Sequence, residues 1–196
     1  MKKELAEAAL KRLFLEAHTF NKFTDQPVED DLIRRLYDLL KWGPTAVNSQ
    51  PARYVFIKSK EGRSRLVPAL LPGNVAKVEA APVTVVVAFD SRFFEHLSAQ
   101  WTAYDAAAPF AGNAVLAREA AFRNGSLQGA YLILAARSLG LDCGPMSGFN
   151  NDKVDAEFFP DGRFKSNFLV NLGYGADNGY YPRGPRLTFE DAATII

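Results

Sequence analysis

The sequence has few of the residues that build metal centres, disulfide frameworks or hydrolase triads. Its 196 residues include one cysteine, Cys143, and two histidines, His18 and His96. A single cysteine excludes an internal disulfide framework. Two histidines far apart leave little material for a His/Cys metal centre or for a Ser-His-Asp hydrolase. We therefore expect no metal ion in this protein.

Net charge is also small. The chain has 23 basic and 22 acidic side chains, a formal net charge of +1, so no strong field attracts nucleic acid or an anionic membrane. No apolar run approaches the length of a membrane span, and the first residues lead into a charged helical pattern rather than a signal core. We expect a cytoplasmic protein that binds neither nucleic acid nor membranes.

Apolar residues, in contrast, are plentiful. They make up 48% of the chain, and a chain of this length can bury roughly 70% of its unfolded surface, so it needs no disulfide or metal ion for stability. No repeat and no linker-like change in composition divides the sequence. We predict a single domain over residues 1–196.

Hydrophobic periodicity alternates between helical and extended patterns. It predicts helices over residues 4–16, 29–42, 66–71, 74–81, 114–139 and 152–158. Runs rich in β-branched residues predict strands over residues 54–57, 83–89 and 167–172, and the second is central because it is apolar on both faces. Residues 91–112 are expected to form a helical excursion or lid, and residues 140–149 a Gly/Pro-rich turn. The pattern is typical of an α+β or α/β fold with a small sheet.

A polar loop over residues 44–51 separates a strongly amphipathic helix from a short strand. Its two prolines restrict their own φ angles and the residues before them. Between them Thr45, Asn48, Ser49 and Gln50 offer hydroxyl and amide groups but no charge. Such a loop suits a neutral, flat, hydrogen-bonding ligand, although a simple helix C-cap and turn remains an alternative.

Several other segments share this chemical style. They are His18-Thr19-Phe20-Asn21, Asn74-x-x-Lys77, Pro145-Met146-Ser147-Gly148 and the C-terminal arginines Arg183 and Arg186. The two guanidinium groups suit a phosphate. Each segment alone is equally compatible with a turn, a cap or a solvated charge.

Taken in order, these segments resemble the nitroreductase family of flavoproteins. The family loop Pro-Ser-x-x-Asn-x-Gln-Pro matches residues 44–51, and its mid-chain Asn-x-x-Lys matches Asn74 and Lys77. Leu-Gly-Leu followed by Gly-Phe matches residues 139–149, and Leu-Gly-Tyr-Gly matches residues 172–175. The resemblance covers nearly the whole chain. It implies an α+β nitroreductase-like fold, with a small central mixed sheet flanked by helices, in an intertwined homodimer with FMN at the interface.

The resemblance also implies a role for each matched residue. The phosphate would be held by His18, Thr19 and Arg186, with Arg183 as a second candidate. The ribityl and pyrimidine side would face Asn21, Asn74 and Lys77, and Lys77 would stabilise negative charge at flavin N1 and O2. The partner chain would supply Thr45, Ala46, Val47, Asn48 and Gln50. The edge from the dimethylbenzene ring to N5 would lie by Met146, Ser147 and Gly148, with a backbone N–H of Ser147 or Gly148 bonded to N5.

Within the family the sequence is most similar to malonic semialdehyde reductases of pyrimidine degradation, through residues 41–45, 144–149 and 165–167. This implies an FMN-dependent oxidoreductase that takes hydride from NADPH or NADH and reduces malonic semialdehyde to 3-hydroxypropionate. Arg53 and Arg123 are candidate partners for the substrate carboxylate. A broad nitro or quinone reductase, or a flavin-binding protein without physiological turnover, are the alternatives.

Overall fold

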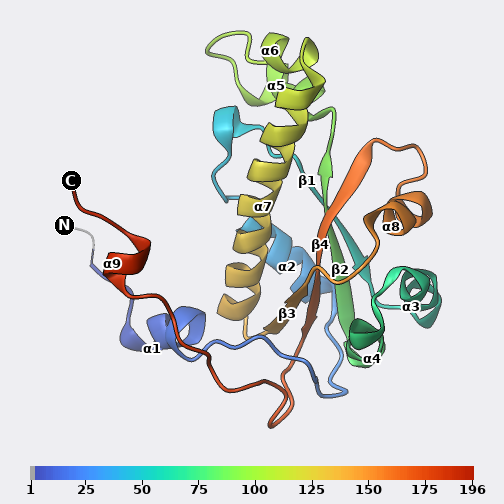
Figure 1. The fold of residues 1–196 in the computed structure, drawn as a ribbon, viewed down its shortest axis with the longest axis vertical. Helices are drawn as coiled ribbons and strands as arrows, with labels where there is room; N and C mark the ends of the chain where they lie inside the picture. Colours follow the sequence, from blue (N-terminus) through green and yellow to red (C-terminus); the bar gives the residue numbers. More distant parts are fainter. Residues whose placement is uncertain (1–2) are drawn as a thin grey trace.

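A four-stranded sheet forms the centre of the computed structural model, which describes residues 3–196 (Figure 1). The strands are β1 (Ala52–Ile57), β2 (Val83–Asp90), β3 (Asp142–Met146) and β4 (Phe164–Gly173), in the order β1-β2-β4-β3. Each neighbouring pair of strands is antiparallel. The expected mixed sheet is therefore wrong: a parallel pairing occurs only as an isolated bridge between Thr19 and Cys143, within the described part of the chain.

Helices and short turns connect the strands. The first helix, α1 (Glu7–Leu10), continues as a π-helical turn (Lys11–Leu15), and 3-10 turns occur at Ala46–Asn48, Val67–Ala69 and Phe93–His96. The remaining helices are α2 (Asp30–Leu40), α3 (Lys60–Leu66), α4 (Pro72–Ala80), α5 (Leu97–Gln100), α6 (Ala108–Ala111), α7 (Ala114–Ser138), α8 (Asn151–Phe158) and α9 (Phe189–Ala192). The α+β class and the long helix α7 agree with the sequence-based prediction.

Two stretches differ from that prediction. The helix expected over residues 66–71 is wrong, because α3 ends at Leu66 and only a 3-10 turn over Val67–Ala69 follows it. The helix lies earlier in the chain, where the Ser59 side chain caps α3 by accepting a hydrogen bond from the Gly62 N–H. The turn expected over residues 140–149 contains β3. As an edge strand, β3 tolerates Pro145, and Gly144 lets its backbone approach the Phe20 carbonyl, where a Cβ would lie within 2.4 Å of the oxygen.

The core has two layers, one on each face of β2, whose eight residues are all buried. Val83, Val85 and Val87 pack with side chains of α2 and α7. Val86 and Ala88 pack with side chains of α3, α4 and α8 on the opposite face. Figure 1 shows this division, with α7 along one face of the sheet and α3, α4 and α8 beyond the other. A strand buried on both faces reads as a continuous apolar run, as predicted for residues 83–89.

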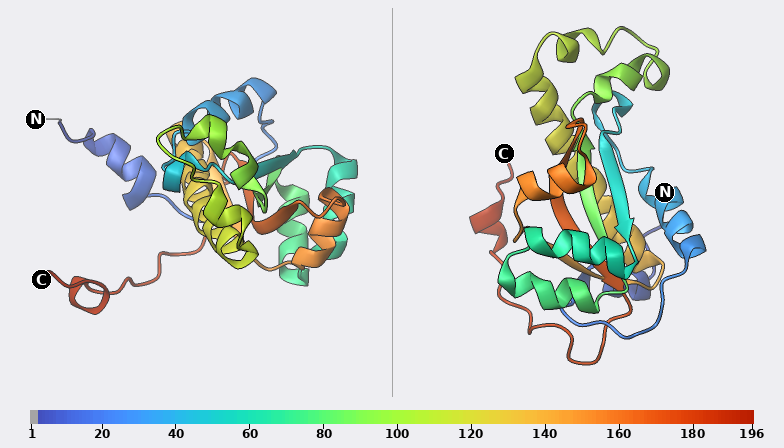
Figure 2. Two further views of the ribbon diagram at one scale, coloured as in Figure 1. Left: turned by 90° about the horizontal axis from the view of Figure 1, so that it is seen from above. Right: turned by 90° about the vertical axis from the view of Figure 1, so that its right-hand side faces the viewer.

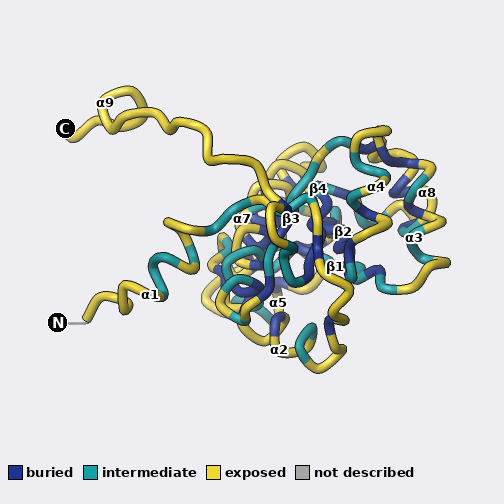
Figure 3. The backbone as a smooth tube through the Cα atoms, turned by 90° about the horizontal axis from the view of Figure 1, so that it is seen from below, coloured by how far each residue is buried: buried dark blue, intermediate teal, exposed yellow. Residues whose placement is uncertain are grey.

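Both chain ends extend from this body. The N-terminal helix and the residues after Gly179 run outward (Figure 2). The residues after Gly179 are exposed, whereas the N-terminal helix has both exposed and half-buried residues (Figure 3). Exposed large apolar side chains on these arms include Leu5, Phe14, Leu187 and Ile195. In the described residues no helix is both long and apolar enough to cross a membrane.

Residues 91–112 form a cap at one end of α7, made of the turn Phe93–His96 with α5 and α6 (Figure 1). The cap has a small core of its own, in which Phe93 and Leu97 pack against Ala117 and Ala121 of α7. This segment therefore has the helical form that its composition suggested.

Candidate functional site

Lys77 and Asn74 of α4 lie against the segment that follows β3. The Asn74 side-chain amide donates to the Gly148 carbonyl at 2.9 Å, and the Lys77 Nζ lies 3.4 Å from the Asn74 Oδ1. Lys77 is half-buried, and among residues 3–196 no carboxylate lies within ion-pair distance of its ammonium group. We call Asn74, Lys77, Ser147 and Gly148 the Lys77 cluster. Its positive charge is free to meet an anionic ligand group.

Gly148 lets the Asn74 amide lie close to the backbone of the Lys77 cluster. A Cβ on Gly148 would lie 2.6 Å from the Asn74 Nδ2 and would displace this amide. Ser147 beside it is exposed. Behind the cluster, the buried Asn171 donates to the Lys77 carbonyl at 2.9 Å and accepts from the Thr84 hydroxyl at 2.7 Å. These bonds tie the end of α4 to the sheet.

The segment over residues 18–21 runs beside β3. The Phe20 N–H donates to the Cys143 carbonyl at 2.9 Å, and the Asn21 N–H donates to the Gly179 carbonyl. The His18 ring stacks on Tyr180 at a centroid distance of 4.1 Å. The structure therefore brings residues 18–21 to β3, the strand that leads into Ser147 and Gly148.

The two C-terminal arginines have different surroundings. The Arg183 guanidinium donates to the Leu15 and Ala17 carbonyls at 2.7 and 2.8 Å, directly before His18. Arg186 donates only to its neighbouring carbonyls of Gly184 and Pro185, within the described residues. Of the two, Arg183 lies with the His18 segment.

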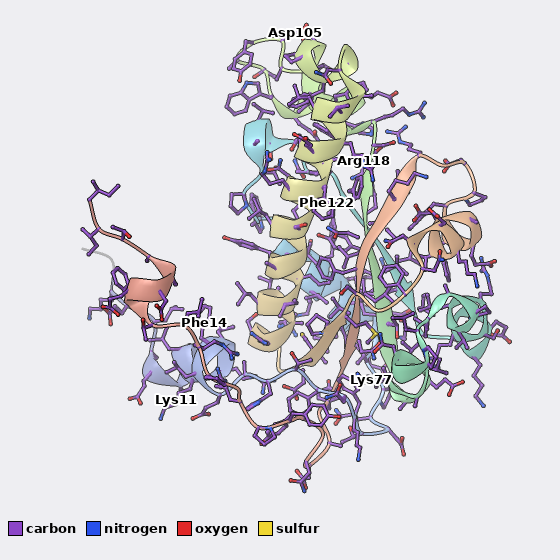
Figure 4. All side chains as sticks on the ribbon, in the orientation of Figure 1. Lys11, Phe14, Lys77, Asp105, Arg118 and Phe122 are labelled. Carbon is purple, nitrogen blue, oxygen red and sulfur yellow. The ribbon has the colours of Figure 1, made fainter. Side chains whose placement is uncertain are left out.

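The polar loop lies elsewhere, against α7 and the cap. The Ala46 N–H donates to the buried Asn124 side chain of α7 at 2.8 Å, and the Asn48 amide donates to the Gln100 carbonyl at 3.1 Å. In Figure 1 the loop lies beside the cap end of α7, whereas α4 is at the far end of the molecule. Lys77 lies at that far end in Figure 4. Within one chain the loop therefore does not join the Lys77 cluster.

The polar loop has an unusual backbone. Val47, Asn48 and Gln50 have φ angles of 48°, 52° and 41°, in a left-handed region that costs a residue other than glycine roughly 1–2 kcal/mol. The Thr45 hydroxyl accepts from the Gln50 N–H at 3.1 Å. The buried Ser49 hydroxyl has no hydrogen-bond partner in residues 3–196. Such local strain is characteristic of ligand clamps and active sites.

Sequence reasoning missed a buried ionic group beside the polar loop. Asp90, at the end of β2, is fully buried and binds Arg53 and Arg163 at 2.8 and 2.9 Å. Burial alone would raise the pKa of Asp90, but hydrogen bonds from Arg163 and the Arg92 N–H, with the charge of Arg53, hold that pKa below its usual range. Arg53 is thus engaged by Asp90, and the idea that it binds a substrate carboxylate is not supported.

Two amide side chains of α7 were also missed as site residues. Asn124 contacts the loop as described, and the buried Gln128 accepts from the Ala52 N–H at 2.9 Å, just after the loop. The sequence offered one signal for them. Asn124 and Gln128 are four positions apart among the small residues of a helix, and an amide side chain inside a helix usually has a hydrogen-bond partner.

Comparison with known proteins matches this arrangement to one family. The sequence profile described as the nitroreductase family matches residues 16–174. The chain belongs to the nitroreductase family. As a member of that family it is an oxidoreductase.

Relatives match this family member over their full length. It is 54% identical over 196 residues, all of both chains, to a protein of Rhodopseudomonas palustris. It is 58% identical over 191 residues, 97% of this chain and 98% of the other, to a protein of Burkholderia lata. The names of both relatives give a proposed NADH dehydrogenase/NAD(P)H nitroreductase activity.

Solved structures share the fold at low sequence identity. A nitroreductase-type protein of Bacillus subtilis superposes with a TM-score of 0.86 at 20% identity, covering 97% of this chain and 100% of the other. One of Exiguobacterium sibiricum, solved in complex with FMN, has a TM-score of 0.84 at 20% identity over all of both chains. These likenesses show that this family member has the α+β nitroreductase-like fold.

Proposed function

We propose that this protein is an FMN-dependent NAD(P)H oxidoreductase with a broad range of nitro and quinone substrates. The observation that carries the proposal is the Lys77 cluster, where an ammonium group with no carboxylate partner in residues 3–196 is linked through Asn74 to Gly148, next to the exposed Ser147. The names of the relatives and the FMN complex of the Exiguobacterium protein support it.

The donor groups of the Lys77 cluster fit FMN. Amides and a single cation suit the pyrimidine edge of a flavin, and the missing Cβ of Gly148 lets the Asn74 amide lie against the backbone there. His18, Thr19 and Arg183 are our candidates for the phosphate, with Arg186 as the alternative, and Asn21 for the ribityl chain. When bound, FMN supplies hydride transfer at N5.

The protein's part in the reaction is electrostatic. Lys77 would place a positive charge beside the pyrimidine edge of bound FMN, where it would favour added negative charge. The N–H of Ser147 or Gly148 would donate to N5, and Met146 would lie along the same edge. Asn171 holds the last turn of α4 against the sheet by donating a hydrogen bond to the Lys77 carbonyl.

We further propose that the site is completed in a homodimer. The polar loop and the Lys77 cluster lie at opposite ends of one chain (Figure 1), so the loop meets the flavin of the other subunit. Its residues Thr45, Ala46, Val47, Asn48 and Gln50 then cover the flavin ring. On this proposal Asn48 and Gln50 contribute to flavin binding only in the dimer, and dilution to monomer weakens FMN affinity.

Malonic semialdehyde is the second candidate substrate. A groove of about 1280 Å³ between α7 and the start of β4 contains Lys165, Ser166 and Asn167, the stretch that carries the closer sequence match. The same groove contains Arg118, which has no ion-pair partner in residues 3–196 and is suited to a carboxylate. Arg118 points from the cap half of α7 beside Phe122 (Figure 4).

Visible spectroscopy tests these proposals. The purified protein is expected to show a flavin spectrum that NADPH or NADH bleaches and a nitroaromatic or quinone restores. Faster turnover of malonic semialdehyde than of either acceptor would select the second candidate, and Arg118→Ala would then raise KM for the aldehyde. A bound flavin that neither nicotinamide bleaches would contradict both and indicate a flavin-binding protein without turnover.

A further inference from the structure

A buried carboxylate joins the polar loop to the rest of the sheet. Asp90 accepts hydrogen bonds from Arg163 through Nε and Nη2, both at 2.9 Å, and from Arg53 Nη2 at 2.8 Å. It also accepts from the Arg92 N–H at 2.9 Å, while Glu95 binds Arg163 and His96 lies 3.9 Å from the carboxylate. The group contacts a residue that we assign to FMN through a hydrogen bond from Arg53 to the Gln50 carbonyl.

Arg53 and Asp90 connect this group to the polar loop. The Arg53 Nη1 donates to the Gln50 carbonyl at 3.0 Å and to the Ala52 carbonyl at 2.9 Å. The Asp90 N–H donates to the Pro51 carbonyl at 2.8 Å. Asp90 at the end of β2 therefore holds two successive carbonyls at the end of the loop. Its own N–H binds the Pro51 carbonyl, and Arg53, which it orients, binds the Gln50 carbonyl.

The loop needs such external support because its conformation is strained. Gln50 itself has a left-handed φ, and its side-chain amide donates to the Asn48 side chain at 3.0 Å. Residues in sparsely populated φ/ψ regions persist only when surrounding contacts fix them. A guanidinium fork, whose own orientation is fixed by Asp90, can provide two directed bonds at once.

We propose that Arg53 is a positioning residue for the polar loop, and that Asp90 acts through it by fixing the direction of the guanidinium group. Arg53 fixes the orientation of the Gln50 carbonyl, and this in turn fixes the direction in which the side-chain amides of Asn48 and Gln50 point. For FMN binding, the inference rests on the proposed function. For the loop conformation, it rests on these contacts alone.

The test compares Arg53→Lys with Arg163→Lys in the full-length protein. Both variants keep the positive charge and lose guanidinium hydrogen bonds to Asp90, one from Arg53 and two from Arg163, but only the first loses the bond to Gln50. Amide hydrogen exchange in residues 46–50 is measured without FMN, because the N–H groups of Asn48, Ser49 and Gln50 are all bonded within the loop. FMN affinity is measured by flavin fluorescence, and the thermal midpoint records any general loss of stability.

Arg53→Lys is expected to speed exchange in the loop about tenfold and to weaken FMN binding about tenfold. Arg163→Lys is expected to leave both within about twofold, even where its thermal midpoint falls as far or further. Equal effects of the two variants, or unchanged loop exchange in Arg53→Lys, would overturn the inference. If the wild type binds no FMN, the proposed function fails, while the exchange measurement still decides the role of Arg53.

Discussion

The two parts of the proposed site are built in different ways. The polar loop has three left-handed residues other than glycine and is held by Asn124 of the distant α7 and by Arg53 of the adjoining β1. The Lys77 cluster joins α4 to the segment after β3, and the side chains of Asn74 and Asn171 hold it by donating to the Gly148 and Lys77 carbonyls. Side chains therefore hold both parts, but the loop has a strained backbone, whereas Asn74 and Lys77 lie in a regular helix.

The largest expected effect is on the loop's support. Asp90→Asn leaves Arg53 and Arg163 facing a neutral amide, and breaking such a buried pair costs about 3 kcal/mol in the free energy of unfolding. Urea denaturation measures the loss. Asp177→Asn, an exposed aspartate in a turn, is the control and should be close to wild type. A loss as small as that of the control would mean that Asp90 does not hold this region.

The same variant has a defined pH dependence. Because the pKa of Asp90 is lowered on folding, its contribution is complete above the unfolded pKa of about 3.9 and is lost as pH falls through the folded value. The difference in unfolding free energy between wild type and Asp90→Asn should stay constant between about pH 5 and 7 and narrow below about pH 4. A difference that instead narrowed towards neutral pH would exclude an ionised Asp90.

The next effect concerns the Lys77 cluster and its chemistry. Lys77→Ala is expected to slow reduction of bound flavin by NADPH about 100-fold, since it removes a charge aimed at the reduced cofactor. Stopped-flow absorbance measures the rate, and circular dichroism checks that the fold is intact. Lys60→Ala, at the first residue of α3, is the matched control. Wild-type rates in Lys77→Ala would remove Lys77 from the mechanism and weaken the comparison between the two parts.

A smaller effect is expected where α7 meets the loop. Asn124→Ala leaves the Ala46 N–H without its partner, at a cost of about 1–2 kcal/mol. Hydrogen exchange of Ala46 should become faster, while amides near Lys77 keep their protection. Arg123→Ala changes the exposed neighbour on the same helix and should alter neither. If Asn124→Ala sped up amide exchange equally in the polar loop and near Lys77, the two parts would form one cooperative unit.

The smallest effect concerns β3, next to the Lys77 cluster. Burial raises the pKa of Cys143 to about 12, so its thiol should not react with a thiol reagent in the native protein at pH 8. Labelling should appear only when the protein is unfolded in urea. Rapid labelling of the native state would show that β3 opens readily despite the burial of Cys143.

Much of the fold could be predicted because the hydrophobic pattern of a long helix or of a fully buried strand is visible in the sequence alone. The apolar run at residues 83–89 identified β2, and the long periodic stretch identified α7. β3 was missed because Gly144 and Pro145 disfavour a strand in isolation. The contact of Gly144 with the Phe20 carbonyl, which makes glycine necessary there, joins residues far apart in the chain.

The sequence by itself determined the family, through the order and spacing of motifs that pointed to Asn74, Lys77 and Gly148 and to the polar loop. Only the tertiary structure decided that these motifs occupy opposite ends of one chain, and that Asp90 and Arg53 support the loop. The physical reason is that a motif records which groups a ligand needs, whereas strain and buried ion pairs depend on long-range contacts. Such contacts exist only once β1, β2 and α7 have packed together.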